Sequence, residues 1–207
     1  MKFISKYVSK VYSDYYINYL NEHDVLNVKS CFDIGSDVGV FVDELNRLGI
    51  SAEGLEPNAK SIQSKKVKLG TFDLDYTTNK KYDLITLPQV IYFLADFESI
   101  CKKIKTMLNS KGVMFIITKT IESEGPITYS DTKTYPLHTE TEYKKIFDRL
   151  GLEIIDISIF QTNIGIAFNQ GKFQATLRLF LFMTGLKKTI TKNSNGNHLY
   201  ILLKLKV

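Results

Sequence analysis

Short apolar segments alternate with amphipathic ones along more than half of the chain. The apolar segments occupy residues 30–34, 50–55, 67–69, 82–87 and 113–118. The last of these segments is apolar almost throughout, which is typical of a parallel strand that is covered on both faces. Residues at helical spacing separate them, over 38–48, 58–64 and 97–108. The alternation predicts an α/β fold with a doubly wound, mostly parallel sheet.

Local signals place several ends of these elements. Gly49 follows the first of the amphipathic segments, and glycine is the residue type that most often closes a helix. The stretch Asn109-Ser-Lys-Gly112 predicts a turn into the fifth strand. Thr139 and Glu142 have the spacing of a capping box, so a helix is predicted from Thr139 to the residue before Gly151.

The two ends of the chain differ from this alternating part. Residues 1–27 are predicted to be helical, and tyrosines fall on more than one of their faces. Two interpretations stay open for this helix: it packs over the sheet, or it is a lid over a ligand site. Residues 152–160 and 198–206 are predicted strands, and the 161–197 segment between them is too long for a hairpin. We expect that segment to be an insertion with its own structure.

Composition narrows the class of protein. The 207 residues are 44% hydrophobic and 24% charged, which suits one domain with a substantial core. Cys31 and Cys101 match neither a metal-ligand spacing nor a disulfide framework, which favours a reducing compartment. Residues 1–20 carry lysines without a continuous apolar core, and no segment is apolar over a bilayer's width. We therefore expect a cytoplasmic protein.

The formal net charge of +5 favours acidic partners such as phosphates or nucleic acid. The lysines are scattered, however, and no arginine-dense stripe with interleaved aromatics is present. Nucleic acid therefore stays a partner that the charge allows and the pattern does not favour.

A glycine-rich turn after the first strand carries most of the functional signal. The stretch Asp33-Ile-Gly-Ser-Asp-Val-Gly39 joins a buried strand to a helix, and the next strand ends in Glu56. Glycines let the backbone approach a ligand closely, and a carboxylate at the end of the second strand can accept hydrogen bonds from both ribose hydroxyls. This order predicts a site for a cofactor that contains a nucleoside.

At this point the chain resembles the class I S-adenosylmethionine-dependent methyltransferases, in particular the small-molecule group called type 11 or type 23. The glycine turn, the Glu56-Pro57-Asn58 stretch, Gly70-Thr71-Phe72 and the long stretch from Tyr82 to Asp96 match that family in order. The resemblance implies a Rossmann-like fold with seven strands, of which the last is antiparallel. The residues it assigns to S-adenosylmethionine, and to its product S-adenosylhomocysteine, are Asp33, Gly35, Ser36, Asp37, Gly39, Glu56, Pro57, Thr71, Phe72, Leu87, Pro88 and Gln89.

The resemblance also divides the chain into parts of a single domain, 1–207. Residues 1–27 would be an N-terminal helical lid, 28–120 the cofactor-binding core, and 121–207 the substrate-side half, with the insertion at 161–197.

One position departs from the family pattern. Asp37 stands where the family usually has glycine, whose missing Cβ permits a close approach and a positive φ. Aspartate is among the few other residues that adopt a left-handed backbone, so the turn can form. Its carboxylate is positioned either to pair with the cofactor's positive groups or to repel the cofactor's carboxylate.

Candidates for chemistry at the acceptor are few. Methyl transfer is an in-line displacement that depends mainly on orientation, although an oxygen acceptor also needs a base nearby. His138 follows the fifth strand, in a region that borders the acceptor in similar proteins, and the competing interpretation is an exposed loop residue. Tyr92 lies after the fourth strand, where it either lines the acceptor site or belongs to the core. No metal ligands are predicted.

The motifs of base-modifying enzymes are missing from the sequence. Leu87-Pro88-Gln89-Val90 replaces the Asp/Asn-Pro-Pro-aromatic box of base-amino methyltransferases. The sequence therefore predicts methyl transfer to a small molecule, at the hydroxyl of a sugar or biosynthetic intermediate. The alternatives are an RNA methyltransferase, or a binding protein that kept the fold and lost catalysis.

The insertion contains one further candidate surface. Residues 171–188 are apolar at many positions and are flanked by lysines. Such a segment is typical of a helix on an anionic membrane surface, of a packed element, or of a dimer contact. A monomer and a homodimer are equally compatible with the sequence.

Overall fold

The computed structural model of the chain describes residues 2–121, 134–162, 190–192 and 196–206. In chain order, the helices and strands are α1 (Lys2–Glu22), β1 (Ser30–Ile34), α2 (Val40–Arg47), β2 (Ser51–Glu56), β3 (Val67–Leu69), β4 (Tyr82–Pro88), the 3₁₀ helix η1 (Ile91–Phe93), α3 (Phe97–Met107), β5 (Leu108–Thr118), α5 (Glu140–Arg149), β6 (Leu152–Thr162), β7 (Ile190–Lys192) and β8 (His198–Leu205).

All described strands join one sheet in the order β3-β2-β1-β4-β5-β8-β6-β7. The strands from β3 to β5 pair in parallel, and β8 runs antiparallel to both of its neighbours, β5 and β6. The predicted mostly parallel sheet with an antiparallel last strand is therefore confirmed. The described sheet has eight strands rather than seven, because the three-residue β7 pairs with the end of β6.

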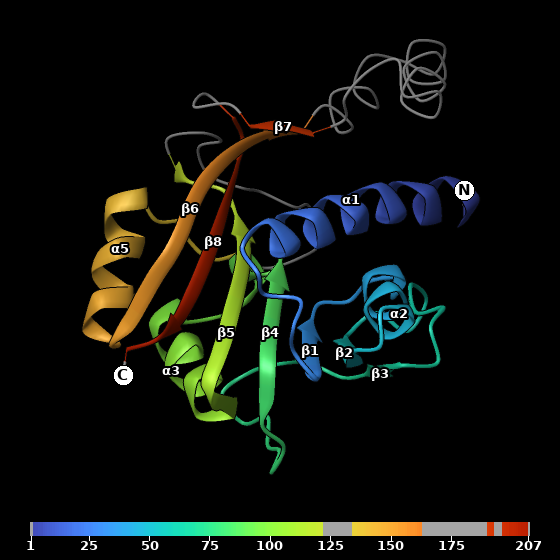
Figure 1. The fold of residues 1–207 in the computed structure, drawn as a ribbon, viewed down its shortest axis with the longest axis horizontal. Helices are drawn as coiled ribbons and strands as arrows, with labels where there is room; N and C mark the ends of the chain where they lie inside the picture. Colours follow the sequence, from blue (N-terminus) through green and yellow to red (C-terminus); the bar gives the residue numbers. More distant parts are fainter. Residues whose placement is uncertain (1, 122–133, 163–189, 193–195, 207) are drawn as a thin grey trace.

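Helices cover both faces of the sheet, as Figure 1 shows. On β5, Met114 and Ile116 face the cluster that contains α3 and α5, while Phe115 and Ile117 face α1 and α2. Alternate residues of a strand point to opposite faces, so a strand covered on both faces is apolar throughout. These four side chains are fully buried. The doubly wound arrangement is thus confirmed.

Helix α1 packs on the sheet through one face. Tyr16, Tyr19 and Leu20 are buried against the α2 side of the sheet, where Tyr19 stacks on Phe115 with ring centroids 5.3 Å apart. In Figure 1 the helix crosses the arrowhead ends of β1 and β4. Helix α1 is therefore part of the core, and it also covers the edge of the sheet at which parallel α/β folds bind ligands.

Two local predictions were wrong. Residues 58–64 form turns instead of a helix, because the Asn58 side chain accepts the Lys60 amide and the Val38 carbonyl accepts the Ser64 amide. Residues 109–112 belong to β5 rather than to a free turn. The pairing advances from Tyr82 to Leu84 on β4 while it advances from Leu108 to Val113 on β5, so these residues form an irregularity within the strand.

The predicted helix ends are confirmed. Gly49 has φ +88° and follows α2, and Gly151 has φ +62° and follows α5. The Thr139 side chain accepts the Glu142 amide, and the Glu142 carboxylate accepts the Thr139 amide, which completes the capping box. The 171–188 segment, and most of the predicted insertion, lie outside the described residues.

Candidate functional site

A cavity of about 710 Å³ lies where α1 crosses the carboxyl ends of β1, β2 and β4. Its volume falls within the range of small-molecule sites, roughly 300–1,000 Å³. We call the part lined by Gly35, Ser36, Asp37, Glu56 and Asn58 the β2 end. We call the part lined by Tyr16, Pro88, Gln89 and Val90 the β4 end.

The glycine turn forms the floor between these two ends. The amides of Gly35 and Ser36 both donate to the Leu55 carbonyl, at 2.8 and 3.1 Å, which ties the turn to β2. Gly35 has φ +77°, and a Cβ there would lie 2.7 Å from a methyl group of Val90. Glycine is therefore required at position 35 by both conformation and space.

Glu56 is fixed at the β2 end by backbone amides. Its Oε2 accepts from the Asp37 amide at 3.0 Å, and its Oε1 accepts from the Asn58 amide at 2.9 Å. The side chain is only 8% exposed and lines the cavity. Each carboxylate oxygen has a second lone pair, so Glu56 can accept two more hydrogen bonds from a ligand. A ribose diol has the matching pair of donors.

Asp37 holds the left-handed backbone that the family's glycine would adopt. Its φ is +47°, and its side chain is exposed at the rim of the cavity. The contribution of this residue to the site is therefore its amide, which fixes Glu56. The turn therefore forms with aspartate in place of the family's glycine.

Asp33 is a second carboxylate at the base of the turn. It is 1% exposed and lines the cavity, and its Oδ1 accepts from the Thr86 hydroxyl at 2.5 Å. Burial raises the pKa of Asp33 to about 6, against the opposing effect of the hydrogen bond from Thr86. Above that pH the cavity holds a poorly solvated negative charge, which favours a cationic ligand group.

At the β4 end, one side chain connects three elements. Gln89 follows β4 with φ +56°, and its amide donates to the Ile117 carbonyl at 2.7 Å. Its Nε2 donates to the Tyr16 hydroxyl of α1 at 3.4 Å, and its Oε1 lies 3.1 Å from Nε2 of His198 at the start of β8. Gln89 is therefore held from both sides of its amide.

Most of the predicted cofactor residues meet in this cavity. Ten of the twelve line it, the exceptions being Leu87 and Gly39. Leu87 is fully buried in the core on the α3 side. A Cβ on Gly39 would lie 2.5 Å from the Ser64 side chain, so Gly39 permits close packing behind the turn instead of facing a ligand. The role of the ten as cofactor ligands stays a prediction.

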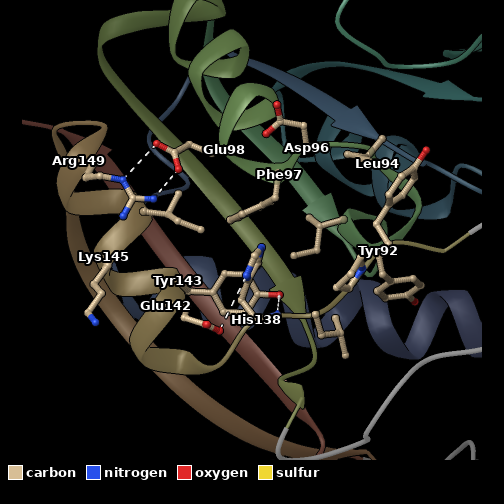
Figure 2. Close-up of a pocket in the computed structure, with 15 residues that line it drawn as sticks. Tyr92, Leu94, Asp96, Phe97, Glu98, His138, Glu142, Tyr143, Lys145 and Arg149 are labelled. Carbon is tan, nitrogen blue, oxygen red and sulfur yellow. Dashed lines mark hydrogen bonds and ion pairs between the residues drawn. The ribbon is translucent and has the colours of Figure 1, made fainter.

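The two predicted acceptor-side residues lie elsewhere. His138 and Tyr92 line a neighbouring cavity of about 460 Å³ between α3 and α5, shown in Figure 2. His138 packs against the rings of Phe97 and Tyr143, and its Nδ1 is 4.0 Å from Glu142. Tyr92 is 4% exposed. Neither residue lines the larger cavity, although the two cavities share Leu94 and Tyr135.

Several cavity residues were missed by the sequence analysis. The aromatic rings of Tyr12, Tyr16, Phe93 and Tyr135 also line the cavity. In addition, His198 contacts the side-chain oxygen of Gln89. The spacing of Tyr12, Tyr16 and Tyr19 along a helix was a signal that could have placed these rings on one face. Nothing near His198 in the sequence indicated its contact with Gln89, because the two residues are 109 positions apart.

The lining has a distinct electrostatic character. Its carboxylates are Asp33, Asp37 and Glu56, and among the described residues that line the cavity there is no lysine, arginine or histidine. A cavity of this kind favours ligands with positive charge and disfavours phosphates. Many of the chain's lysines lie on the outer surface instead.

Comparison with known proteins agrees with the fold. A family model described as a methyltransferase domain matches residues 16–157. The chain belongs to this methyltransferase family. The prediction of a class I S-adenosylmethionine-dependent methyltransferase is thereby confirmed.

A curated relative of this chain is the ubiquinone biosynthesis O-methyltransferase of Pelagibacter ubique. The two are 29% identical over 109 residues, which is 47% of this chain and 45% of the relative. The match thus spans about half the length of the relative.

Solved structures share the fold of this chain at low sequence identity. An S-adenosylmethionine-dependent methyltransferase from Clostridium acetobutylicum is 14% identical with a TM-score of 0.64, covering 96% of this chain and 92% of that one. The magnesium protoporphyrin IX methyltransferase from Synechocystis, bound to S-adenosylhomocysteine, is 13% identical with a TM-score of 0.58, covering 95% and 83%. Within the described residues, no helix is long and apolar enough to cross a membrane.

Proposed function

We propose that this methyltransferase transfers the methyl group of S-adenosylmethionine to a hydroxyl of a small, uncharged molecule, such as a sugar or a biosynthetic intermediate. The observation that carries the proposal is the Glu56 carboxylate, fixed by two backbone amides in a cavity of suitable size. Family membership supplies the reaction class, and the cavity supports where the ligands bind.

The residues at the β2 end fit the nucleoside part of the cofactor. Glu56 would accept hydrogen bonds from both ribose hydroxyls, as its prearranged oxygens allow. Thr71 and Phe72 line the cavity next to it and would contact the adenine ring. Asp33 and the glycine turn would face the ammonium group of the amino acid part, which would compensate the buried carboxylate there.

When bound, S-adenosylmethionine would supply a methyl group on a positively charged sulfur. Its transfer to a hydroxyl forms an O–CH3 bond, breaks the S–CH3 bond to leave a neutral thioether, and releases the hydroxyl proton to water or a nearby base. The protein's part is orientation and exclusion of water. The rings of Tyr12, Phe93 and Tyr135 line the cavity with Gln89 and would enclose a small acceptor. The lack of cations among the described lining residues disfavours a phosphate-rich acceptor such as RNA.

The test is calorimetric titration of the purified protein with S-adenosylmethionine and S-adenosylhomocysteine. We expect micromolar affinity, reduced at least about tenfold in Glu56→Ala because hydrogen bonds to a charged group are lost. Glu53→Ala is the matched control, since Glu53 lies on the same strand but pairs with Lys68 and Lys80 outside the cavity. Its affinity should equal that of the wild type.

Other outcomes would decide between the alternatives. No binding to the wild type at millimolar ligand would contradict the proposal and favour a binding protein that lost catalysis. Transfer of a labelled methyl group to RNA, with an affinity that falls steeply as salt rises, would favour an RNA acceptor over a small molecule.

A further inference from the structure

The backbone of Gln89 is held in a conformation that glutamine rarely adopts. Its φ is +56°, in the left-handed region, and its amide is committed to the Ile117 carbonyl. Such a conformation costs free energy and persists where the surroundings over-determine it, which happens most often at functional sites. The position directly after β4 places Gln89 in the cavity lining beside the glycine turn.

The side chain of Gln89 is also held, by one contact at each end of its amide. His198 meets its oxygen at 3.1 Å, and its nitrogen donates to the Tyr16 hydroxyl. A side-chain amide nitrogen has two hydrogens, and the bond to Tyr16 uses one of them. The second hydrogen is therefore left for a ligand in the cavity that Gln89 lines.

The direction of this chain of hydrogen bonds follows from the state of His198. The ring is 5% exposed, and burial, with a smaller effect from the positive charge of Lys119, lowers the pKa of His198 to about 4. A neutral imidazole carries one N–H. The nearest atom to Nδ1 is Oδ1 of the half-buried Asn197, at 2.8 Å, and a half-turn of that amide exchanges its oxygen and nitrogen and puts an N–H donor against Nδ1. The single N–H is then on Nε2 and points at Gln89.

We propose that His198 is a positioning residue that fixes the Gln89 oxygen, so that the free amide hydrogen of Gln89 is a stationary donor to a ligand oxygen at the β4 end of the cavity. The geometry of the three side chains carries this inference. The identity of the ligand oxygen rests on the proposed function: it belongs either to the carboxylate of the cofactor or to the hydroxyl of the acceptor.

The test uses NMR of the Gln89 side-chain amide in the full chain, assigned by the signals that disappear in Gln89→Glu. We expect a dispersed pair of proton signals whose exchange with water is slow. In His198→Leu the exchange should accelerate about tenfold, the factor that corresponds to one lost hydrogen bond. His198→Gln keeps an N–H donor and should restore slow exchange, which a purely structural role for the ring would not do.

His138→Leu is the matched control, because His138 lines the neighbouring cavity and should leave the Gln89 signals unchanged. Signals in His198→Leu that match the wild type would overturn the proposal. Should His198→Leu fail to fold, rapid exchange in a folded His198→Gln protein would overturn it equally, and slow exchange there supports it.

Addition of S-adenosylhomocysteine distinguishes the two ligand oxygens. A shift of the Gln89 signals assigns the donor to the cofactor carboxylate, and unchanged signals on saturation assign it to the acceptor. The proposed function can fail while the role of His198 stands. That is the outcome if the wild type does not bind S-adenosylhomocysteine but the Gln89 signals still depend on His198.

Discussion

The two ends of the cavity are held together by different parts of the chain. At the β2 end, backbone amides from Asp37 and Asn58 fix the carboxylate of Glu56. At the β4 end, the side chains of Tyr16 and His198 fix the side chain of Gln89. The first arrangement uses residues within about twenty positions of one another, and the second joins α1, β4 and β8.

The difference determines how each end responds to substitution. A backbone amide survives a change of side chain, so the β2 end should tolerate substitutions that keep its turn. A hydrogen bond between two side chains is lost when either residue is substituted. The geometry of the β4 end should therefore depend on Tyr16 and on His198 separately. Three substitutions in the β2 end or directly beside it probe the first half of this comparison, from the largest expected effect to the smallest.

Asp33 lies at the base of the glycine turn, beside the β2 end, and its carboxylate accepts from the Thr86 side chain. We expect Asp33→Asn to raise the free energy of unfolding at pH 7 by up to about 3 kcal/mol, because it removes a buried charge whose pKa is raised from 3.8 to about 6. Affinity for S-adenosylhomocysteine should fall at the same time, because its ammonium group loses a negative partner. Urea unfolding and calorimetry measure the two effects.

The pH dependence gives the control for Asp33. Between about pH 4 and pH 6 the folded wild type binds more protons than the unfolded chain, so its stability falls as pH rises through this window. Asp33→Asn lacks that contribution, and the two proteins should become equally stable near pH 4. A constant difference across this range would contradict the raised pKa.

Gly54 tests whether the turn must stay close to β2. A Cβ at this position would lie 2.2 Å from Oγ and 2.9 Å from Cβ of Ser36, so Gly54→Ala should displace the turn and cost about 2 kcal/mol of stability. Weaker binding of S-adenosylhomocysteine should accompany it. Gly49→Ala is the control: it strains a residue with φ +88° and no neighbour within 4 Å, and it should leave affinity unchanged. Native affinity in Gly54→Ala would show that the turn tolerates displacement.

Asp37 gives the smallest expected effect. Asp37→Gly keeps the amide that fixes Glu56 and suits the φ of +47°, so affinity for S-adenosylhomocysteine should change by less than about 0.5 kcal/mol. Calorimetry of this variant beside the wild type measures the effect of the exposed carboxylate alone. A large gain or loss would mean that the side chain, and not the backbone, decides binding at the β2 end.

Elements with strong local signals could be predicted from the sequence. The strands β1 and β3 were predicted with the bounds they have, because apolar segments ended at polar turns. The helix predicted over 58–64 does not form, although the spacing of its residues is helical. The Asn58 side chain and the Val38 carbonyl accept hydrogen bonds from amides of this segment. Propensity is a weak guide where side chains compete for backbone hydrogen bonds.

In the site, as in the fold, features that are local in sequence could be predicted and long-range contacts could not. The glycine turn and Glu56 are close in sequence, so a pattern could connect them. The contacts of Gln89 depend on the strand order, which brings β8 beside β5, and no local pattern encodes that order. The predicted place of His138 at the acceptor site depended on a long connection, and the residue lines the neighbouring cavity.

The position of β8 between β5 and β6 has a consequence for how the chain folds. β5 and β6 are synthesised before β8, and each exposes an unpaired edge until β8 pairs with it. Folding from the N-terminus can complete the glycine turn and the Glu56 contacts early, whereas the contact between His198 and Gln89 forms only after β8 has been synthesised. The pairing of β8 therefore closes the gap in the sheet and completes the β4 end of the cavity in one step.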